Sequence, residues 1–224
     1  MSKNIAIDGP AGAGKSTIAK QIAKRLNYIY VDTGAMYRAM ALYLMRQGVN
    51  PADVEQIGRV CQNASISIAY ENGEQVVYLN GENVNAYLRT EEVGNMASAT
   101  SVVPRLREKL VSLQKELAAQ KDCVMDGRDI GTCVLPKADV KIYLTASSLV
   151  RARRRMEELL AKGQSADLET IKADIEERDY RDMHRETSPL CQAQDAVLVD
   201  NSDMTLEQGV ERILEVCKEK GLLS

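Results

Sequence analysis

Short apolar runs alternate along the chain with longer segments in which apolar residues recur at the spacing of an α-helix. The short runs have the length and composition of buried parallel strands. The predicted strands are 5–7, 28–31, 123–125, 140–144 and 196–199. The predicted helices are 16–26, 33–48, 104–119, 147–162 and 167–185, with further helical sequence from Thr90. This alternation predicts an α/β fold, in which helices cover both faces of a parallel sheet.

One stretch of the chain departs from this alternation. Apolar and polar residues alternate with a period of two over 65–70, and a second run at 75–79 follows the dipeptide Asn72-Gly73. Asn-Gly between two such runs is a strong hairpin signal, because both residues tolerate the positive φ values of a tight turn. Another Asn-Gly dipeptide follows at 80–81. We therefore predict a small antiparallel insert over about 62–88.

The bulk composition is typical of a globular enzyme. A length of 224 residues suffices for one core with a small appended lobe. The net charge of −3 is spread over mixed signs, so we expect neither a nucleic-acid partner nor an anionic membrane surface. No heptad repeat or exposed apolar stripe stands out, which predicts a monomer.

The chain carries five cysteines and a single histidine, His184. The cysteines form no CxxC pair, which predicts reduced thiols and no zinc site. One histidine also argues against a histidine-based triad. The first residues lead into a strand without a long apolar stretch, so we expect no signal peptide and no membrane span. Together these features predict a cytoplasmic protein.

The clearest chemical motif is a glycine-rich loop between the first strand and the first helix. It matches the pattern GxxxxGK[ST] through Gly9, Gly14, Lys15 and Ser16. Glycines allow backbone N–H groups to curl around phosphate oxygens, and the following helix presents its positive N-terminus to them. Lys15 is placed to reach the β- and γ-phosphates, and the Ser16 hydroxyl to ligate Mg²⁺. The loop predicts binding of a nucleoside triphosphate.

A phosphate loop alone also fits a nucleotide-dependent switch or partner-binding module. A GTPase switch should carry a DxxG segment and an NKxD guanine reader. The sequence has no DxxG, and its nearest approach to the reader, 136–139, lacks the Asn. A different small-molecule P-loop kinase, of the shikimate or coenzyme type, is a further alternative. The hairpin insert and the DGRD segment at 126–129 argue against that alternative.

Several arginines are placed to face an anionic ligand. Arg38 follows the second strand, and Arg128 lies at a strand end, where open parallel sheets hold their ligands. Arg178, Asp182 and Arg185 are spaced to share one helix face. Guanidinium groups suit phosphate oxygens because their forked donors match them bidentately. Ordinary solvated helix faces are the alternative, which predicts that Arg178→Ala and Arg185→Ala are tolerated.

The chain offers few groups for acid–base catalysis. An acceptor phosphate has a second pKa of about 6, so it is mostly dianionic at neutral pH and already a nucleophile. Transfer to such a group needs positioning and charge neutralisation but no general base. One histidine and many arginines therefore favour phosphate-to-phosphate transfer over phosphorylation of a hydroxyl.

In the order and spacing of its motifs, the sequence resembles the bacterial cytidylate kinases over essentially its whole length. The segments that carry the resemblance are IDGPAGAGKST (7–17), DTGAMYR (32–38), the hairpin insert, 95–107 with PRLR, DGRDIGT (126–132) and 177–185 with ERDYRD and Arg185. Only the phosphate loop is shared with other P-loop nucleoside monophosphate kinases.

This resemblance implies a single P-loop NMP-kinase domain. It has a five-stranded parallel sheet flanked by helices, a small antiparallel β insert in the NMP-binding lobe and a short helical lid. The implied core is 1–33, 100–150 and 187–224, the lobe is 34–99 and the lid is 151–186. The implied reaction transfers the γ-phosphoryl group of ATP to CMP or dCMP with Mg²⁺.

The resemblance also implies a role for each matching residue. The ATP phosphates are held by Gly9, Pro10, Ala11, Gly12, Ala13, Gly14, Lys15, Ser16 and Thr17, with Ser16 at the metal. The acceptor phosphate and the migrating group are bound by Arg38, Arg128 and Arg185. The cytosine pocket is lined by Thr33, Ser98, Arg107 and Asp129, and the ribose is held by Arg178 and Asp182. The arginines of 151–155, Arg154 among the implied catalytic residues, belong to the lid and close over ATP.

The assignment of Asp129 to the base has independent chemical support. Cytosine presents an amino donor where uracil presents a carbonyl, and carboxylates are the usual partners of that amino group. A buried Asp129 would place two acceptors face to face when uracil is bound. The alternative is that Asp129 is a structural partner of Arg128 or of a helix N-terminus.

Two positions depart from common forms of the family. Thr33 stands where members often have Ser, which keeps the hydroxyl and adds a methyl group. Ser16-Thr17 replaces the Gly-Thr of some members. Whether Mg²⁺ meets Ser16 directly or through water is therefore open.

Overall fold

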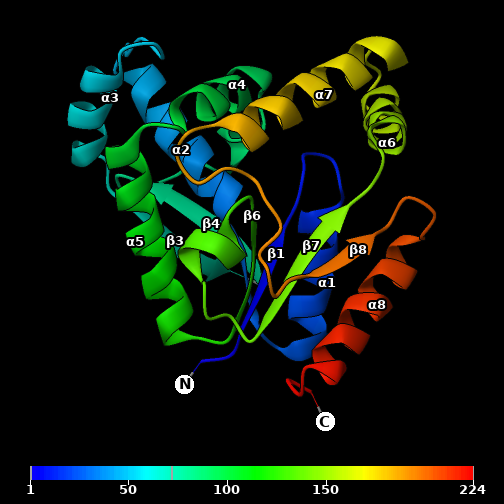
Figure 1. Cartoon of the computed structure of the whole chain (residues 1–224). Helices are drawn as coiled ribbons and strands as arrows, with labels where there is room; N and C mark the ends of the chain where they lie inside the picture. The colour runs from blue at the N-terminus through cyan, green and yellow to red at the C-terminus, as the bar shows by residue number, and fades with distance from the viewer. Residues whose placement is uncertain (1, 72, 224) are drawn as a thin grey trace. The chain divides into compact units, whose positions relative to one another are not determined.

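The apolar runs pair as a parallel sheet in the computed structural model, which describes residues 2–71 and 73–223. The sheet has five strands in the order β2-β6-β1-β7-β8 (Figure 1). Their bounds are β1 Asn4–Asp8, β2 Ile29–Asp32, β6 Cys123–Gly127, β7 Val140–Thr145 and β8 Val197–Asp200. β1 pairs in parallel with β6 and β7, and β7 pairs in parallel with β8. The predicted five-stranded parallel sheet is confirmed.

The chain divides into two compact units, Met1–Tyr28 with Asp122–Ser224 and Ile29–Lys121. The helices of the first unit are α1 Lys15–Leu26, α6 Ser148–Ala161, α7 Leu168–His184, α8 Leu206–Glu219 and a π-helical turn at Ile130–Val134. α1 packs on β1 and β6, α8 packs on β7 and β8, and α6 packs against α7. The division into core, lobe and lid remains a prediction.

Burial in the first unit follows the apolar patterning. Ile5, Ala6 and Ile7 of β1 are all fully buried, as expected for a parallel strand covered on both faces. Helix α1 buries one stripe, from Ile18 to Ala23, at helical spacing. Asn27 ends this helix in the left-handed conformation, with a φ of 56°. The loop that joins β1 to α1 is thus held between two well-packed elements.

The second unit contains the predicted hairpin. Its strands are β3 Ile66–Glu71, β4 Glu74–Leu79 and β5 Glu82–Asn83. Its helices are α2 Thr33–Arg46, α3 Val54–Val60, α4 Glu91–Thr100 and α5 Pro104–Gln120, with 3-10 turns at Cys61–Asn63 and Asn85–Tyr87. β3 and β4 pair antiparallel, which confirms the insert, although Asn72 itself lies outside the described residues. The second Asn-Gly turn adds β5, so the insert is a three-stranded sheet.

Side-chain caps set the helix starts that the sequence predicts. Asp32 accepts a hydrogen bond from the N–H of Ala35 at the start of α2, and Asp167 accepts one from Thr170 at the start of α7. Helix α3, which follows the cap Asp53, was not predicted. Its seven residues are too few to establish a helical period.

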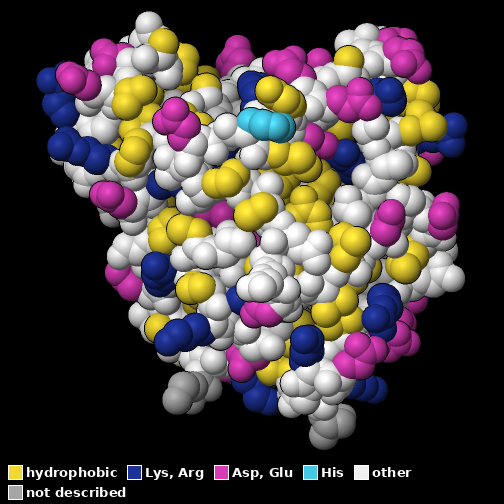
Figure 2. Space-filling view, viewed as in Figure 1, with side chains coloured by type: hydrophobic (Ala, Val, Ile, Leu, Met, Phe, Trp, Pro, Cys, Tyr) yellow, Lys and Arg dark blue, Asp and Glu magenta, His cyan; other side chains and the backbone are white. Residues whose placement is uncertain are grey.

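The surface charges are of mixed sign, and three of the five cysteines are buried. On the face shown in Figure 2, Lys and Arg side chains are interspersed with Asp and Glu. Cys61, Cys123 and Cys217 are buried and Cys191 is exposed, all as free thiols. Within residues 2–71 and 73–223, no helix has both the length and the apolar character that a membrane crossing requires.

Candidate active site

The glycine-rich loop leaves the carboxyl end of β1 and enters α1. A Cβ added to Gly9, whose φ is 149°, would lie 1.9 Å from the carbonyl oxygen of Leu144 in β7, so only glycine fits there. Gly12 and Gly14 have φ values of 75° and 84°. Left-handed residues within such a loop turn successive N–H groups toward one side, which forms an anion-binding nest. The N-terminus of α1 adds its positive end to the same nest.

The outer side of the loop is anchored through its carbonyl groups. Each of three carbonyl oxygens accepts a hydrogen bond from a side chain of the same unit. The pairs are Lys15 with Pro10 at 2.7 Å, Arg151 with Ala11 at 2.9 Å and Asn201 with Ala13 at 2.9 Å. Fixing these carbonyls also fixes the peptide planes, so the N–H groups of the loop are oriented before any ligand binds.

Lys15 is the buried cation of the loop. The pKa of its ammonium group is lowered to about 7, chiefly by burial and then by the nearby positive charge of Arg128, whereas Asp126 and Asp8 oppose the shift. A bound phosphate would add negative charge beside Lys15 and raise this pKa. Binding of a phosphate and protonation of Lys15 are therefore linked.

Ser16 and Asp126 form an oxygen pair beside the loop. The Ser16 hydroxyl donates to Oδ2 of Asp126 at 2.9 Å, and Asp126 lies near the end of β6. A hydroxyl of the phosphate loop with a strand-end carboxylate is a suitable donor set for Mg²⁺, which prefers oxygen ligands and binds through few carboxylates. The structure thus adds Asp126 as a second candidate ligand beside Ser16, a role that the sequence analysis did not assign to it.

Asp8 holds the segment that follows β6. Its carboxylate accepts hydrogen bonds from the N–H groups of Ile130 at 2.8 Å and Gly131 at 2.7 Å. Burial raises the pKa of Asp8 to about 6, although both N–H groups favour its charged form. Because Ile130–Val134 is the π-helical turn, Asp8 fixes the backbone directly after Arg128 and Asp129.

Two arginine–carboxylate pairs join the end of β6 to α7 and the residue after it. Nε of Arg128 donates to Oδ2 of Asp182 at 2.8 Å, and Nη2 of Arg185 lies 3.5 Å from Oδ1 of Asp129. Burial alone would raise the pKa of Asp182, but Arg128 chiefly, with Arg178 and Arg185, lowers it. The four predicted residues are therefore neighbours. The sequence predicted that Arg185 lies within the helix 167–185, whereas α7 ends at His184 and Arg185 follows it on extended backbone.

The arginines of α6 divide into two groups. Arg151 is buried and reaches the phosphate loop, whereas Arg153 and Arg155 are exposed. Arg154 donates to the side-chain oxygen of Asn201 at 3.2 Å and to its backbone carbonyl at 2.9 Å. Asn201 in turn donates to the carbonyl of Ala13, so Arg154 is linked to the phosphate loop through Asn201.

In the second unit, α2 carries two of the predicted substrate residues. Thr33 is its first residue and is buried. Arg38 forms an ion pair with Asp32 at 3.1 Å, and the amide of Gln75 bonds the backbone of Asp32. Nε of Arg38 is buried and has no hydrogen-bond partner among the described residues. Such an unsatisfied donor is consistent with a ligand-binding role.

The two remaining predicted residues lie on α4 and α5. Arg107 of α5 is buried, donates to the carbonyl of Ser101 at 3.3 Å and lies over the ring of Tyr37, 5.8 Å from its centroid. Ser98 is half-buried on α4, which packs against α2. The contacts with Ser101 and Tyr37 fix the position of the Arg107 side chain within its unit. The assignment of Ser98 and Arg107 to a base pocket remains a prediction.

Sequence reasoning missed the structural role of five residues that shape the site, although it had placed one of them, Arg151, among the lid arginines. They are Asp8, Asp126, Arg151, Asp179 and Asn201. Two of them carried a signal, since Asp8 ends an apolar strand and Asn201 follows one, where parallel sheets place functional groups. Arg151 and Asp179 carried none, because each lies in a run of similar charged residues.

The nest, the buried Lys15 and the Ser16–Asp126 pair, at the carboxyl ends of parallel strands, define a P-loop nucleotide-binding protein. A family model described as cytidylate kinase matches residues 5–219, and the chain belongs to this family. A cytidylate kinase from Lactobacillus johnsonii is 48% identical over 96% of this chain and 94% of its own length. One from Caldicellulosiruptor saccharolyticus is 48% identical over 95% and 94%. The predicted resemblance is confirmed.

Comparison with solved structures shows similarity of the fold, without similarity of sequence. An uncharacterized protein from Eubacterium ventriosum matches with a TM-score of 0.53 at 13% identity. The match covers 98% of this chain and 99% of that one. The α/β architecture is thus common to chains that share little sequence.

Substitution of Gly9 tests the close approach of the loop to β7. Gly9→Ala should abolish binding of a fluorescent ADP analogue, because the added Cβ would displace the loop from Leu144. Gly221→Ala is the matched control, since Gly221 also has a positive φ but has no atom within 4 Å of its added Cβ. The control should lose only about 1–2 kcal/mol of stability in thermal melts and bind normally. Equal binding by both variants would contradict the assignment.

The pKa of Lys15 predicts a pH dependence of nucleotide binding. Below pH 7 the ammonium is already charged, so this group contributes no pH dependence; above it, binding requires proton uptake and the affinity for Mg-ADP should fall. Calorimetry in two buffers with different ionisation enthalpies measures that uptake. In Lys15→Arg the cation cannot deprotonate, and the additional slope above pH 7 should disappear. Identical slopes in the two proteins would rule out Lys15 as the linked group.

Proposed function

We propose that the protein transfers the γ-phosphoryl group of ATP to CMP or dCMP, which gives CDP or dCDP and ADP. The observation that carries the proposal is the match of the cytidylate kinase family over residues 5–219. The phosphate loop and the strand-end arginines supply chemistry suited to that reaction. We also expect a cytoplasmic monomer that acts on small molecules and needs neither nucleic acid nor a membrane.

The donor half of the reaction would rely on the loop. Its N–H groups and Lys15 would bind the ATP phosphates, and Ser16 with Asp126 would hold Mg²⁺. The ion, when bound, neutralises charge on the β- and γ-phosphates. Because the loop carbonyls are already anchored, little reorganisation is needed as charge develops in the transition state.

The acceptor half would rely on arginines rather than on a base. An oxygen of the acceptor phosphate attacks the γ-phosphorus, and the bond from that phosphorus to the β–γ bridging oxygen breaks. Arg38, Arg128 and Arg185 would neutralise the acceptor and the migrating group. The carboxylates nearest to two of them, Asp182 and Asp129, are paired with arginine, which argues against their use as general bases.

Selection of cytosine would fall to Asp129. This carboxylate is buried, and Nη2 of Arg185 lies 3.5 Å from its Oδ1, which is longer than the 2.8 Å of the Arg128–Asp182 pair. That geometry is compatible with acceptance of a hydrogen bond from the cytosine amino group. A purely structural pairing of Asp129 with Arg185 is the competing explanation, and it predicts no effect on base choice.

Assays of the purified protein against several acceptors test the reaction itself. With ATP and Mg²⁺, CMP and dCMP should be the best acceptors when compared with UMP, AMP and shikimate in a coupled ADP-release assay. Lys15→Met should lose at least about a hundredfold in rate while it keeps its thermal melt. Slow hydrolysis without stimulation by any acceptor would favour a nucleotide switch and refute the proposal.

Substitution of Asp129 tests the base assignment. Asp129→Asn should lower the ratio of kcat/KM for CMP to that for UMP by about tenfold or more, since an amide can also donate to uracil. Asp182→Asn is the matched control, because it removes a carboxylate that pairs with Arg128 and is not expected to reach the base. The control should lose rate but keep the ratio. If the ratio is also unchanged in Asp129→Asn, the base pocket is misassigned.

A further inference from the structure

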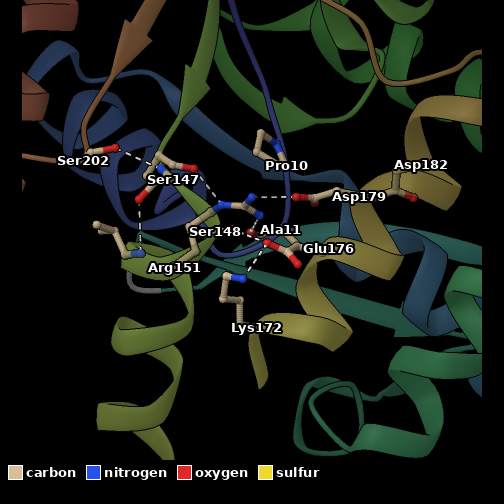
Figure 3. A network of polar contacts seen from close by, with 12 residues as sticks. Pro10, Ala11, Ser147, Ser148, Arg151, Lys172, Glu176, Asp179, Asp182 and Ser202 are labelled. Carbon is tan, nitrogen blue, oxygen red and sulfur yellow. Dashed lines mark hydrogen bonds and ion pairs between the residues drawn. The ribbon is translucent and has the colours of Figure 1, made fainter. Parts of the chain in front are cut away.

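Arg151 is a buried arginine whose three guanidinium nitrogens each contact an oxygen of the first unit. Its Nε donates to the carbonyl of Ala146 at 2.8 Å, its Nη1 donates to the carbonyl of Ala11 at 2.9 Å, and its Nη2 contacts Oδ2 of Asp179 at 2.6 Å. Figure 3 shows the guanidinium between the phosphate loop and α7. One buried side chain therefore joins the end of β7, the loop and α7.

The stem of Arg151 also lies against the loop. A Cβ added at Gly12, whose φ is 75°, would lie 3.4 Å from Cβ of Arg151. The loop is thus packed against the first turn of α6 as well as bonded to it. Movement of Arg151 would shift the peptides around Ala11 and Gly12, which belong to the predicted phosphate nest.

The carboxylate that pairs with Arg151, Asp179, lies on the turn of α7 that also carries predicted substrate-binding residues. Asp179 directly follows Arg178 and precedes Asp182 by three residues, which places Asp179 and Asp182 on neighbouring turns of one face. Asp182 in turn bonds Arg128 at the end of β6. A constraint on Asp179 is therefore a constraint on the turn that presents Arg178 and Asp182.

We propose that Arg151 and Asp179 are positioning residues which hold the acceptor-binding turn of α7 at a fixed place relative to the phosphate loop. This proposal rests on the proposed function for its substrates. Neither residue has to touch ATP or CMP. Arg151 is thereby separated from the arginines of 151–155 that were expected to close over ATP.

The bonding of the pair favours a positioning role over simple stabilisation. Oδ1 of Asp179 is buried and has no hydrogen-bond partner among the described residues. A buried ion pair that leaves one oxygen unsatisfied adds little stability, because desolvation offsets much of the attraction. The planar fork of arginine, however, can hold three partners at fixed angles, which lysine cannot do.

A second contact between α6 and α7 provides the matched control. Oε1 of Glu176 accepts a hydrogen bond from Ser148 at 2.7 Å and lies 3.2 Å from Nζ of Lys172, also shown in Figure 3. This contact joins the same two helices but is exposed and does not reach the phosphate loop. The charge of Glu176 acts only weakly on Arg151, after its contacts with Ser148 and Lys172. Glu176→Gln therefore perturbs the packing of α6 on α7 and leaves the bonds of Arg151 to Ala11 and Asp179 in place.

The test compares steady-state kinetics of Asp179→Asn, Arg151→Lys and Glu176→Gln. In the first two variants kcat/KM for CMP should fall by about tenfold to a hundredfold, with a raised KM for CMP and a several-fold raised Kd for a fluorescent ADP analogue. Glu176→Gln should stay within about twofold of the wild type on every parameter. A purely structural role would instead lower the melting temperature and the active fraction while KM for CMP stays constant.

The outcomes separate this proposal from the proposed function. Wild-type protein that does not phosphorylate CMP refutes the function, and the ADP affinity of Arg151→Lys then decides the positioning role by itself. If one variant fails to fold, the other supplies the measurement, and if both fail, the pair is structural and the proposal is overturned. Wild-type KM and Kd values in a folded variant, or equal losses in Glu176→Gln, overturn it as well.

Discussion

The first unit depends on one constraint, namely that backbone N–H groups must be turned toward a single point and kept there without a ligand. The loop satisfies this constraint through its outer side. Gly9 brings the backbone against β7, and side chains from α1, α6 and the residue after β8 hold three carbonyls. Preorganised dipoles of this kind stabilise charge more effectively than groups that must first reorient.

Charge balance gives the site a second organising feature. Lys15 is buried close enough to Arg128 and Arg178 for both to lower its pKa. In the structure, carboxylates offset part of this positive charge, through the pairs Arg128–Asp182 and Arg185–Asp129. Phosphate groups would supply the charge that is still lacking. This explains why a site with few candidate bases still suits phosphoryl transfer, in which neutralisation and alignment provide most of the rate enhancement.

The sequence was sufficient for the sheet, the phosphate loop and the longer helices that follow Asp32 and Asp167, because each depends on local patterns. Apolar runs of strand length located β1, β6 and β7, and Asp32 and Asp167 located two helix starts. Helix α3 escaped because it is too short to show a period. The contact of Arg151 with the phosphate loop was not foreseen for a different reason, since the sequence placed Arg151 with the lid arginines. Four arginines lie within five residues, and only the packing of α6 on the loop determines which one is buried.

The partners of each arginine distinguish scaffold from substrate-binding roles. Arg151 donates to two backbone carbonyls, which a phosphate cannot replace without breaking the loop that binds it. Arg128 and Arg185 pair with carboxylates, whose charge resembles that of a phosphate, so a substrate can compete for their donors. The same guanidinium chemistry therefore serves two purposes in one unit. Arg128 and Arg185 each donate to a carbonyl as well, but to one within three residues of themselves, whereas Arg151 holds the carbonyl of Ala11 in the phosphate loop.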